Sequence, residues 1–446
     1  MSKNITSTKQ HLIACEECGL VVAIPNLPDG HDAHCPRCEH ILTHTIRFPY
    51  QRPIAYAAAC LIMLVLSLCF SFMSFSVQGI EQQITLFNAV QILDEFHNLA
   101  LAILLLGTII VFPGLYVTML IFLYGMAAIK ADSPQQADSP SWLKPLCRTL
   151  FKIEPWLMVD VFLIGVLVSL IKIASLADIA MGVSFWAFCA YACLLVKCVA
   201  LVDRNWLWER FFPSPAIAGV SAGDTHQSGN HVSCHLCHQI HPVSRAELTN
   251  HNAKLRCTRC HSRLHPVNSH VNLQKAWALL IAAIVFYFPA NLYPIMNTVS
   301  LGKEDPATIL GGVILLWEHG SYPIALVIFT ASIFIPIAKM LALAWLFYSA
   351  EQKHTVPLAM TMTRLKIYRV TEFIGRWSMI DVFVVALLVA LVQLNNLMAI
   401  YPGPAALSFA SVVIFTMLSA MMFDSRLLWE VCSEPEADVN NVRRSA

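Results

Sequence analysis

The stretch Trp156-Leu-Met-Val-Asp160-Val-Phe162 recurs later in the chain as Trp377-Ser-Met-Ile-Asp381-Val-Phe383. Each copy opens an apolar run, Trp156 to Leu176 and Trp377 to Leu397. Such a run is long enough for a membrane-spanning helix, because about 30 Å of hydrocarbon takes about 20 helical residues to cross. The recurrence therefore predicts a membrane protein built from two similar halves.

Six further apolar runs of similar length accompany these two. Buried helices of a large soluble core would show polar stripes with a period near 3.6 residues, and these runs show almost none. We therefore expect eight membrane spans, at Pro53 to Val77, Leu99 to Ile129, Trp156 to Leu176, Ile179 to Val202, Ala276 to Val299, Gly320 to Phe347, Trp377 to Leu397 and Pro404 to Phe423.

The composition agrees with helices that are covered by lipid. Of the 446 residues, 57% are apolar or aromatic and only 13% are charged, whereas soluble domains carry about 25% charged residues. This balance excludes a disordered chain and argues against a soluble enzyme. The formal net charge of +1 leaves no basic surface for nucleic acid.

The distribution of Lys and Arg predicts the orientation of the spans, because cytoplasmic loops are enriched in these residues. Lys172, Lys197 and Lys339 lie inside spans and Lys303 lies in an opposite loop, and the other 25 of the 29 basic residues fall on one side. The segment Met1 to His44 also lacks the basic-then-apolar start of a signal peptide. We therefore expect both termini to be cytosolic.

Eight of the 15 cysteines form four Cys-x-x-Cys pairs, and the pairs form two quartets with 16 and 19 intervening residues. Both gaps match the zinc-ribbon pattern, in which four thiolates surround Zn²⁺. A reducing cytosol disfavours disulfides, and four pairs in two quartets fit a thioredoxin-like motif poorly. We expect two zinc ions per chain, with iron as the alternative metal, at Cys15, Cys18, Cys35, Cys38, Cys234, Cys237, Cys257 and Cys260.

Several histidines crowd these quartets, but each quartet is complete without them. We therefore expect the histidines to lie around the metal sites or on the surface, and they are His31, His34, His40, His235, His238 and His261.

The repeat covers the ribbons as well as the spans, so each half consists of one ribbon followed by four spans. Four is an even number, and both halves therefore share one orientation, as a parallel repeat. The predicted fold is an all-α polytopic membrane protein with a tandem duplication and eight spans. Its expected parts are ribbon 1 at 1–48, membrane module 1 at 49–212, ribbon 2 at 213–272, membrane module 2 at 273–432 and a cytosolic tail at 433–446.

The outer loops repeat as Thr85 to Glu95 and Thr308 to Glu318. We expect each to form a short apolar helix that ends in an acid, either as an interfacial connector or as a docking site for a periplasmic partner.

Five ionisable residues lie within the spans, where a charge costs about 2.5 to 3.5 kcal/mol, and such residues are candidates for function. Asp160 and Asp381 are duplicated, whereas Lys172 and Lys339 are not. Lys197 is close enough to a span end to reach the interface. Asp381 and Lys339 have compatible depths, so they form either a buried pair or two separately solvated groups.

Prolines interrupt spans two, five and six, and Asn291 between Pro289 and Pro294 can supply an amide to a freed carbonyl. A discontinuous helix beside Lys339 is a candidate lipid or proton site, with a simple packing kink as the alternative. The candidates for transport or proton coupling are Asp160, Lys172, Asn291, Glu318, Lys339 and Asp381.

The Cys pairs, Phe288-Pro-Ala-Asn-Leu-Tyr-Pro-Ile-Met296, the stretch Gly312 to Pro323 and Gly375-Arg-Trp-Ser-Met-Ile-Asp-Val-Phe383 closely resemble the paraquat-inducible protein A family. The resemblance covers nearly the whole chain. It implies a bacterial inner-membrane protein that works with a periplasmic MCE-domain tunnel protein, moves lipids between membranes and supports envelope integrity. The first half has Phe70-Ser-Phe-Met-Ser-Phe75 where the second has its proline motif, so any role of that motif rests on the second half.

The sequence and the resemblance together predict a lipid-handling membrane subunit, with a phospholipid or similar amphiphile as its ligand. No Gly-x-x-x-x-Gly-Lys-[Ser/Thr] motif occurs, so we expect neither ATP hydrolysis nor another enzymatic activity. Two alternatives remain open at this point. One is a non-transporting zinc-ribbon scaffold or sensor, and the other is a membrane redox protein.

Overall fold

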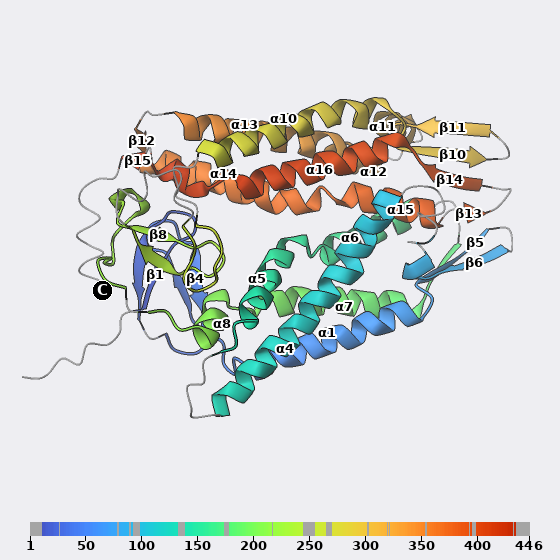
Figure 1. The fold of residues 1–446 in the computed structure, drawn as a ribbon. Helices are drawn as coiled ribbons and strands as arrows, with labels where there is room; N and C mark the ends of the chain where they lie inside the picture. Colours follow the sequence, from blue (N-terminus) through green and yellow to red (C-terminus); the bar gives the residue numbers. More distant parts are fainter. Residues whose placement is uncertain are drawn as a thin grey trace, which may run out of the picture.

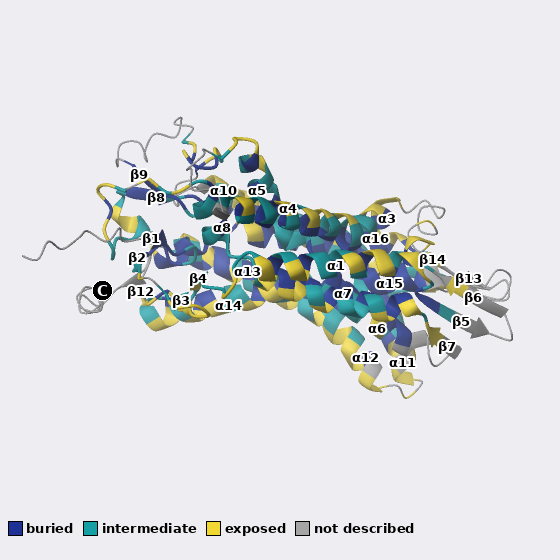
Figure 2. Ribbon diagram, turned by 90° about the horizontal axis from the view of Figure 1, so that it is seen from below, coloured by how far each residue is buried: buried dark blue, intermediate teal, exposed yellow. Residues whose placement is uncertain are grey.

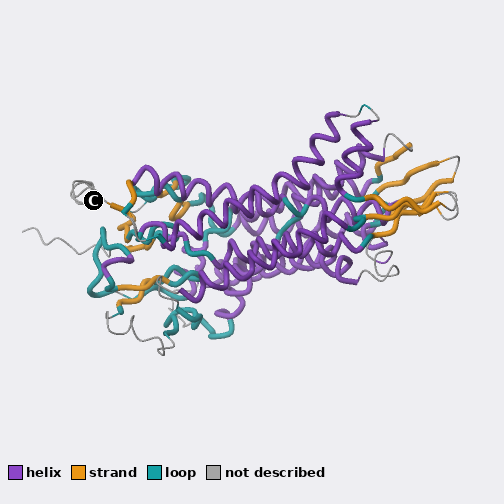
Figure 3. The backbone as a smooth tube through the Cα atoms, turned by 90° about the horizontal axis from the view of Figure 1, so that it is seen from above, coloured by secondary structure: helices purple, strands orange, loops and turns teal. Residues whose placement is uncertain are grey.

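The computed structural model describes residues 11–433 except for 26, 78–79, 89–90, 92–98, 133–138, 174–177, 216, 244–254, 265–269, 301–302, 319, 321, 353–354, 392, 395–397 and 431. The molecule is elongated, with a helical bundle between two groups of strands (Figures 1 and 3). We call the end that carries the cysteine hairpins the ribbon end. The opposite end, which carries the larger sheets, is the sheet end.

Helices make up most of both halves. The first half has α1 (Gln51–Cys69), α3 (Leu99–Leu106), η1 (Gly107–Val111), α4 (Phe112–Asp132), α5 (Leu143–Ile153), η2 (Glu154–Trp156), α6 (Val159–Ile173), α7 (Val183–Ala200) and α8 (Arg204–Phe211). The second half follows η3 (His226–Ser228) and has α10 (His270–Leu292), α11 (Ile309–Glu318), α12 (Tyr322–Phe329), η4 (Thr330–Phe334), α13 (Ile335–Glu351), α14 (Leu358–Trp377), α15 (Ile380–Leu391), α16 (Pro404–Met422) and η5 (Ser425–Trp429).

Among the described residues, seven helices are long and apolar enough to cross a membrane. They are Gln51–Cys69, Leu99–Lys130, Leu143–Leu170, Val183–Ala200, Val271–Leu292, Ala325–Glu351 and Pro404–Met422. Large apolar side chains on their outer surfaces, such as Ile62, Ile103 and Trp186, are more than half exposed, as lipid contact requires. Figure 2 shows exposed positions on the outside of the bundle and buried ones within it. The chain is therefore a mostly helical, polytopic membrane protein.

The eighth expected span, Trp377 to Leu397, is shorter than predicted. Its helix α15 has 12 residues, or about 18 Å at 1.5 Å per residue, and residues 393–394 already belong to a strand. The third expected span, Trp156 to Leu176, contains the apolar helix α6. The longer candidate segment Leu143–Leu170 also includes the preceding helix α5, which carries Lys144, Arg148 and Lys152.

The prediction of an all-α fold was wrong, because both halves carry a sheet at the sheet end (Figure 3). The first half has the order β6-β5-β7, and the second has β11-β10-β14-β13. The sheets join the end of each half's first span to the start of its last span, through antiparallel pairs such as Phe75↔Ile179 and Thr298↔Ile400. Their strands are β5 (Met73–Val77), β6 (Ile80–Ile84), β7 (Asp178–Met181), β10 (Met296–Ser300), β11 (Lys303–Ala307), β13 (Gln393–Leu394) and β14 (Met398–Pro402).

The expected outer-loop helix of the second half is confirmed as α11, which ends at Glu318. Most of its first-half counterpart, Thr85 to Glu95, lies outside the described residues.

Of the two alternatives for the proline-containing spans, the described residues show local changes of the helical turn rather than a discontinuous helix beside Lys339. Pro289 lies inside α10, which continues to Leu292, and Pro113 and Pro336 each follow a single π-helical turn, η1 or η4. Proline lacks an amide hydrogen, and the wider turn moves the neighbouring carbonyls out of the proline ring's way. Tyrosine hydroxyls from neighbouring helices donate to the π-turn carbonyls, at 3.4 Å from Tyr191 to Ile109 and from Tyr287 to Ile333.

The two halves meet along α6 and α15, which begin with the recurring Asp-Val-Phe stretches. The rings of Phe162 and Phe383, which are equivalent in the repeat, pack edge to face with centroids 5.6 Å apart. Gly165 brings the helices together, since a Cβ atom there would lie 3.3 Å from Cβ of Phe383. Contact between equivalent residues is the arrangement expected about a pseudo-twofold axis.

The ribbon end contains short antiparallel hairpins. In ribbon 1, β1 (His11–Ala14) pairs with β2 (Val21–Ile24), and β3 (Asp32–His34) pairs with β4 (Ile41–His44). In ribbon 2, β8 (His231–Ser233) pairs with β9 (Ile240–Pro242). A short parallel pair of β12 (Val356–Pro357) and β15 (Cys432–Ser433) lies nearby.

Candidate functional site

Four Cys-x-x-Cys turns at the ribbon end share one backbone geometry. In each turn, the residue after the second cysteine donates its N–H to the carbonyl of the first, at 2.9 Å. That residue has a positive φ in every case, and only the first is glycine. The four are Gly19, Glu39, His238 and His261. The left-handed conformation is unfavourable for residues other than glycine. Its recurrence at three such residues shows that the geometry of the turn outweighs their preference for a negative φ.

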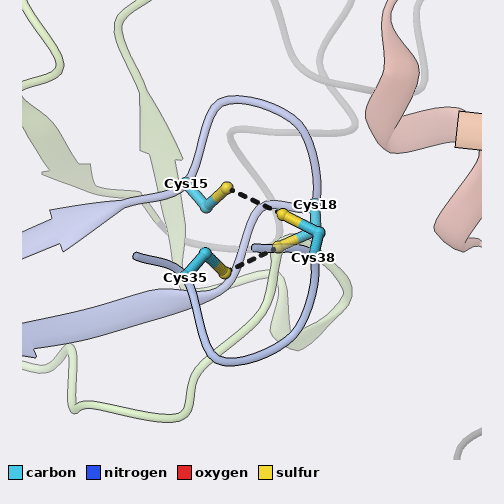
Figure 4. Close-up of side chains that lie close together, drawn as sticks. All are labelled: Cys15, Cys18, Cys35 and Cys38. Carbon is cyan, nitrogen blue, oxygen red and sulfur yellow. Dashed lines mark hydrogen bonds between the residues drawn. The ribbon is translucent and has the colours of Figure 1, made fainter. Parts of the chain in front are cut away.

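The turns bring the cysteines into two buried quartets whose Sγ atoms all lie within 4.8 Å of one another. In the first quartet, Sγ of Cys15 is 3.5 Å from that of Cys38, and Cys18 is 3.5 Å from Cys35 (Figure 4). The second quartet has spacings of 3.5 Å and 3.4 Å between its corresponding pairs. Tetrahedral Zn–S bonds of about 2.3 Å place sulfurs about 3.8 Å apart. Each quartet therefore fits one metal ion.

The surrounding histidines bind other groups, and neither described cluster includes one. His40 contacts Glu17 at 3.3 Å, His238 contacts Glu16, and His235 contacts Arg426 at 2.8 Å. His31 contacts the carbonyl of Asp29, and His34 contacts the carbonyl of Glu39. His261 contacts the side chain of Lys144. Sequence reasoning missed His241, whose Nε2 is 3.2 Å from Sγ of Cys257.

The two ribbons pack on different parts of the helical bundle. Ribbon 1 shares a hydrophobic core with α10, α13, α16 and η5 of the second half. Ribbon 2 belongs to the larger core, which combines α8 and the spans of the first half with α15 and part of α16. Ribbon 1 also exchanges hydrogen bonds with the start of α8 in its own half, from Thr43 to Asp203 at 2.6 Å and from Asn205 to the carbonyl of Leu42 at 2.8 Å. It thus bridges the two halves, with its hydrophobic core in the other one.

Equivalent arginines fix this crossed arrangement. The guanidinium carbon of Arg37 lies 4.2 Å from the ring centroid of Trp429 in η5, and that of Arg259 lies 6.0 Å from Trp208 in α8. Each arginine also donates to the carbonyl of a cysteine, at 3.2 Å for Arg37 and 3.3 Å for Arg259. Both occupy the position before the last cysteine of their quartet, which is the sequence signal that would have identified them.

A second crossed contact joins ribbon 1 to α14. Arg369 Nε donates to Glu17 at 3.0 Å, and Arg369 also donates to the carbonyl of Cys38 at 2.8 Å. Burial alone would raise the pKa of Glu17, but hydrogen bonds from His40 and Arg369 hold that pKa below its ordinary value. Burial, together with the charge of Glu17, raises the pKa of the nearby Glu372.

Lys339, at 4% exposure, is the most buried of the membrane candidates whose side chains the structure describes. Its Nζ donates to Oγ1 of Thr416 in α16 at 2.9 Å. Gly375 in α14 leaves room for the ammonium group, since a Cβ atom there would lie 3.2 Å from Nζ. Of the two arrangements expected for Lys339 and Asp381, a buried pair or separate solvation, the described contacts of Lys339 do not include the pair. Sequence reasoning missed both Thr416 and Gly375.

Lys339 instead lines a cavity of about 610 Å³ between the halves, together with Asp160 of α6. We call it the interhalf cavity. Its lining comes from η2, α6, α7 and α8 of the first half and from α13, α14 and α16 of the second. The charged lining residues are Glu154, Asp160, Arg204, Lys339, Arg369, Glu372 and Arg376.

Three other membrane candidates, Asn291, Glu318 and Asp381, do not line this cavity. Asn291 donates its amide to the carbonyl of Tyr287 at 2.9 Å near the end of α10, and Glu318 is exposed at the end of α11. Asp381 is partly buried at the start of α15. Lys172 belongs to α6, and its side chain lies outside the described part of the chain.

Comparison with known proteins identifies the family. The sequence model of the family described as Paraquat-inducible protein A matches residues 50–212 and 273–433, one match in each half. The chain is 40% identical over 437 residues to "Intermembrane transport protein PqiA" of Escherichia coli strain K12, covering 96% of this chain and 97% of the relative.

Two further relatives are more distant. A "Probable intermembrane transport protein" of Haemophilus influenzae is 30% identical, over 96% of this chain and 98% of the relative. The "Lipophilic envelope-spanning tunnel protein A" of Escherichia coli strain K12 is 29% identical, over 93% and 90%. These names describe transport proteins and no enzyme, and no solved structure matches the chain. The two family matches and the 40% identity over nearly its full length show that the chain belongs to the paraquat-inducible protein A family.

Proposed function

We propose that this protein is the inner-membrane subunit of an intermembrane lipid transport system, in which it exchanges a phospholipid-like amphiphile with a periplasmic MCE-domain tunnel protein. The names of its relatives support intermembrane transport. The observation that carries the proposal is the buried ammonium group of Lys339 between two membrane helices. A charge in that position is costly and is characteristic of substrate or ion pathways.

In this proposal the ribbon end faces the cytosol and the sheet end faces the periplasm, as the basic loops indicate. Helix α15 serves as a short eighth span, so that the modules at 49–212 and 273–432 each contain four. Each cysteine quartet holds one zinc ion, whose role is to fix the ribbon fold. Iron is the alternative occupant of the same thiolate sites.

The experiment is complementation of an envelope defect in a strain that lacks the transporter. Lys339→Met removes the charge and keeps a long side chain, so it should abolish complementation without loss of protein from the membrane. The matched control is Lys197→Met, because Lys197 is also a span lysine but is exposed on α7. It should complement like the wild type. Full complementation by Lys339→Met would overturn the assignment of this site.

Variants tested in the same strain distinguish a transport subunit from a scaffold or sensor. A transport subunit should co-purify with both an MCE-domain protein and phospholipid, and Lys339→Met should retain the partner while losing function. A scaffold or sensor would keep full function in Lys339→Met but lose it when a cysteine quartet is disrupted. The crossed ribbons give this alternative its structural basis, because the metal sites bridge the two halves.

A further inference from the structure

The interhalf cavity reaches the lipid-facing surface of the bundle. Val196 of α7, Phe373 of α14 and Met421 of α16 line it and are 51%, 57% and 45% exposed. Val196 and Met421 belong to candidate spans and lie within the last turns of α7 and α16, at the ribbon end. Exposed apolar side chains at this depth contact acyl chains. The cavity therefore has an apolar rim in the leaflet next to the ribbons.

The interior of the same cavity is charged, and part of that charge is already satisfied within the protein. Arg204 lies 3.6 Å from Glu154, Arg369 binds Glu17, and Lys339 binds Thr416. Arg204 and Arg369 are thus paired with acids, one of which lines the cavity, whereas Lys339 makes one hydrogen bond to a neutral hydroxyl.

The remaining three charged groups are Asp160, Glu372 and Arg376. None of them makes a side-chain hydrogen bond or ion pair within the described part of the chain. Arg376 is near enough to Glu372 to oppose the rise in the pKa of that acid. Charged groups beside an apolar rim need a counter-group or water to offset the cost of their partial desolvation. One base and two acids are thus available to a ligand that carries both signs of charge.

We propose that the interhalf cavity binds the headgroup of a zwitterionic phospholipid from the adjacent leaflet, with the phosphate at Arg376 and the ammonium group at Asp160 and Glu372. Arginine matches phosphate in geometry and charge. The acyl chains leave across Val196 and Met421 into the bilayer. The inference rests on the proposed function and specifies its substrate class and the leaflet from which lipid enters.

The volume and the charge balance both support a headgroup of this kind. A cavity of about 610 Å³ lies within the roughly 300 to 1,000 Å³ that is typical of small-molecule sites. The charged part of the lining consists of four bases and three acids, so positive and negative charge nearly balance inside the cavity. A purely anionic headgroup would meet Asp160 and Glu372 as well as Arg376, and its binding would be weaker for that reason.

The test is photo-crosslinking of lipid to the full-length protein in nanodiscs. A benzoylphenylalanine replaces either Met421, at the rim, or Tyr348, which is 59% exposed near the end of α13 and does not line the cavity. The discs contain radiolabelled phosphatidylethanolamine or phosphatidylglycerol. The rim position should label about tenfold more strongly with phosphatidylethanolamine, and the Tyr348 position should show no preference.

Variants of the full chain then identify the groups that bind. Arg376→Gln should lower labelling at the Met421 position about tenfold, and Arg376→Lys should restore most of it. Asp160→Asn should remove the preference for phosphatidylethanolamine while leaving phosphatidylglycerol labelling unchanged. Metal content and melting temperature in detergent check that each variant is folded. Equal labelling of the two positions, or labelling that is indifferent to Arg376 in folded protein, would overturn the proposal.

Complementation of the same variants separates this inference from the proposed function. If Arg376→Gln loses lipid labelling but complements fully, the lipid site stands and its role in transport is refuted. If Lys339→Met loses complementation while the Met421 position labels no more than Tyr348, transport stands and the lipid site is refuted.

Discussion

The ammonium group of Lys339 illustrates what a single residue reveals in sequence and what it does not. A lysine in the middle of an apolar run is conspicuous, because its burial is costly wherever it points. Its partners are not conspicuous, since Thr416 and Gly375 are common residues in distant helices. The alternative of a buried pair with Asp381 relied on depth alone, and depth does not define which side of a helix a residue occupies.

Gly375 offers a direct test of the space around that ammonium group. Gly375→Val should displace Nζ from Thr416, because even a Cβ atom would lie 3.2 Å from it. We expect overpacking of about 1 to 3 kcal/mol and loss of complementation. The control is Gly125→Val in α4, where a Cβ atom would have nothing within 4 Å. Equal complementation by the two variants would contradict this role of Gly375.

The equivalent arginines of the two ribbons should differ in their contribution to stability. Arg259 has a side chain 5% exposed, an ion pair with Glu209 at 2.8 Å and a hydrogen bond to the carbonyl of Phe212 at 2.6 Å. Arg259→Ala should therefore cost about 2 to 3 kcal/mol. Arg37→Ala should cost about 1 kcal/mol, mainly through its contact with Trp429. Melting temperatures in detergent check the order, which Arg259→Met and Arg37→Met should preserve.

At the level of elements, long helices and cysteine turns could be predicted, whereas short strands could not. Twenty apolar residues in a row, or two cysteines separated by two residues, specify their structure locally. The strands at the sheet end have two to five residues, and several were absorbed into neighbouring apolar runs. The alternation of apolar and polar residues in Met73 to Val77 was the available signal.

The sheets depend on two equivalent glycines that precede α7 and α16. A Cβ atom on Gly182 would lie 2.0 Å from the carbonyl oxygen of Ser71, and one on Gly403 would lie 2.1 Å from that of Pro294. Gly182→Ala and Gly403→Ala should therefore each destabilise the protein by at least about 3 kcal/mol and reduce its amount in the membrane. Gly125→Ala is the matched control and should be neutral. Wild-type levels of Gly182→Ala would refute this close approach.

At the level of the whole molecule, the tandem repeat and the two cysteine clusters were predicted, and the crossing of the ribbons was not. Repeat and spacing are properties of the chain itself. The choice of which half a ribbon contacts depends on surfaces that are formed only after both halves have folded. The charge pairs that define the crossing, such as Glu17 with Arg369, are separated by most of the chain.

The crossing predicts which helices are destabilised when each ribbon loses its metal ion. Cys38→Ser should lower the metal content by about one ion per chain and increase amide hydrogen exchange at the ribbon ends of α14 and α16, in the second half. Cys260→Ser should increase exchange in α5 and α8, in the first half. Hydrogen exchange measured by mass spectrometry distinguishes the two patterns. For Cys38→Ser, a rise in hydrogen exchange mainly in the first half, which follows ribbon 1 in the sequence, would contradict the crossing.

The crossed ribbon also bears on how such a chain can have arisen. A single ancestral unit of one ribbon and one membrane module would have no second half on which to place its ribbon. Two copies could each provide the packing surface for the other's ribbon, by exchanging ribbons about a twofold axis as in a domain-swapped homodimer. A gene fusion would then tie the two copies together, and one of them would be free to acquire Lys339 where the other keeps Tyr116, the equivalent position 223 residues earlier in the repeat. The covalent link permits an asymmetry that an obligate homodimer cannot have.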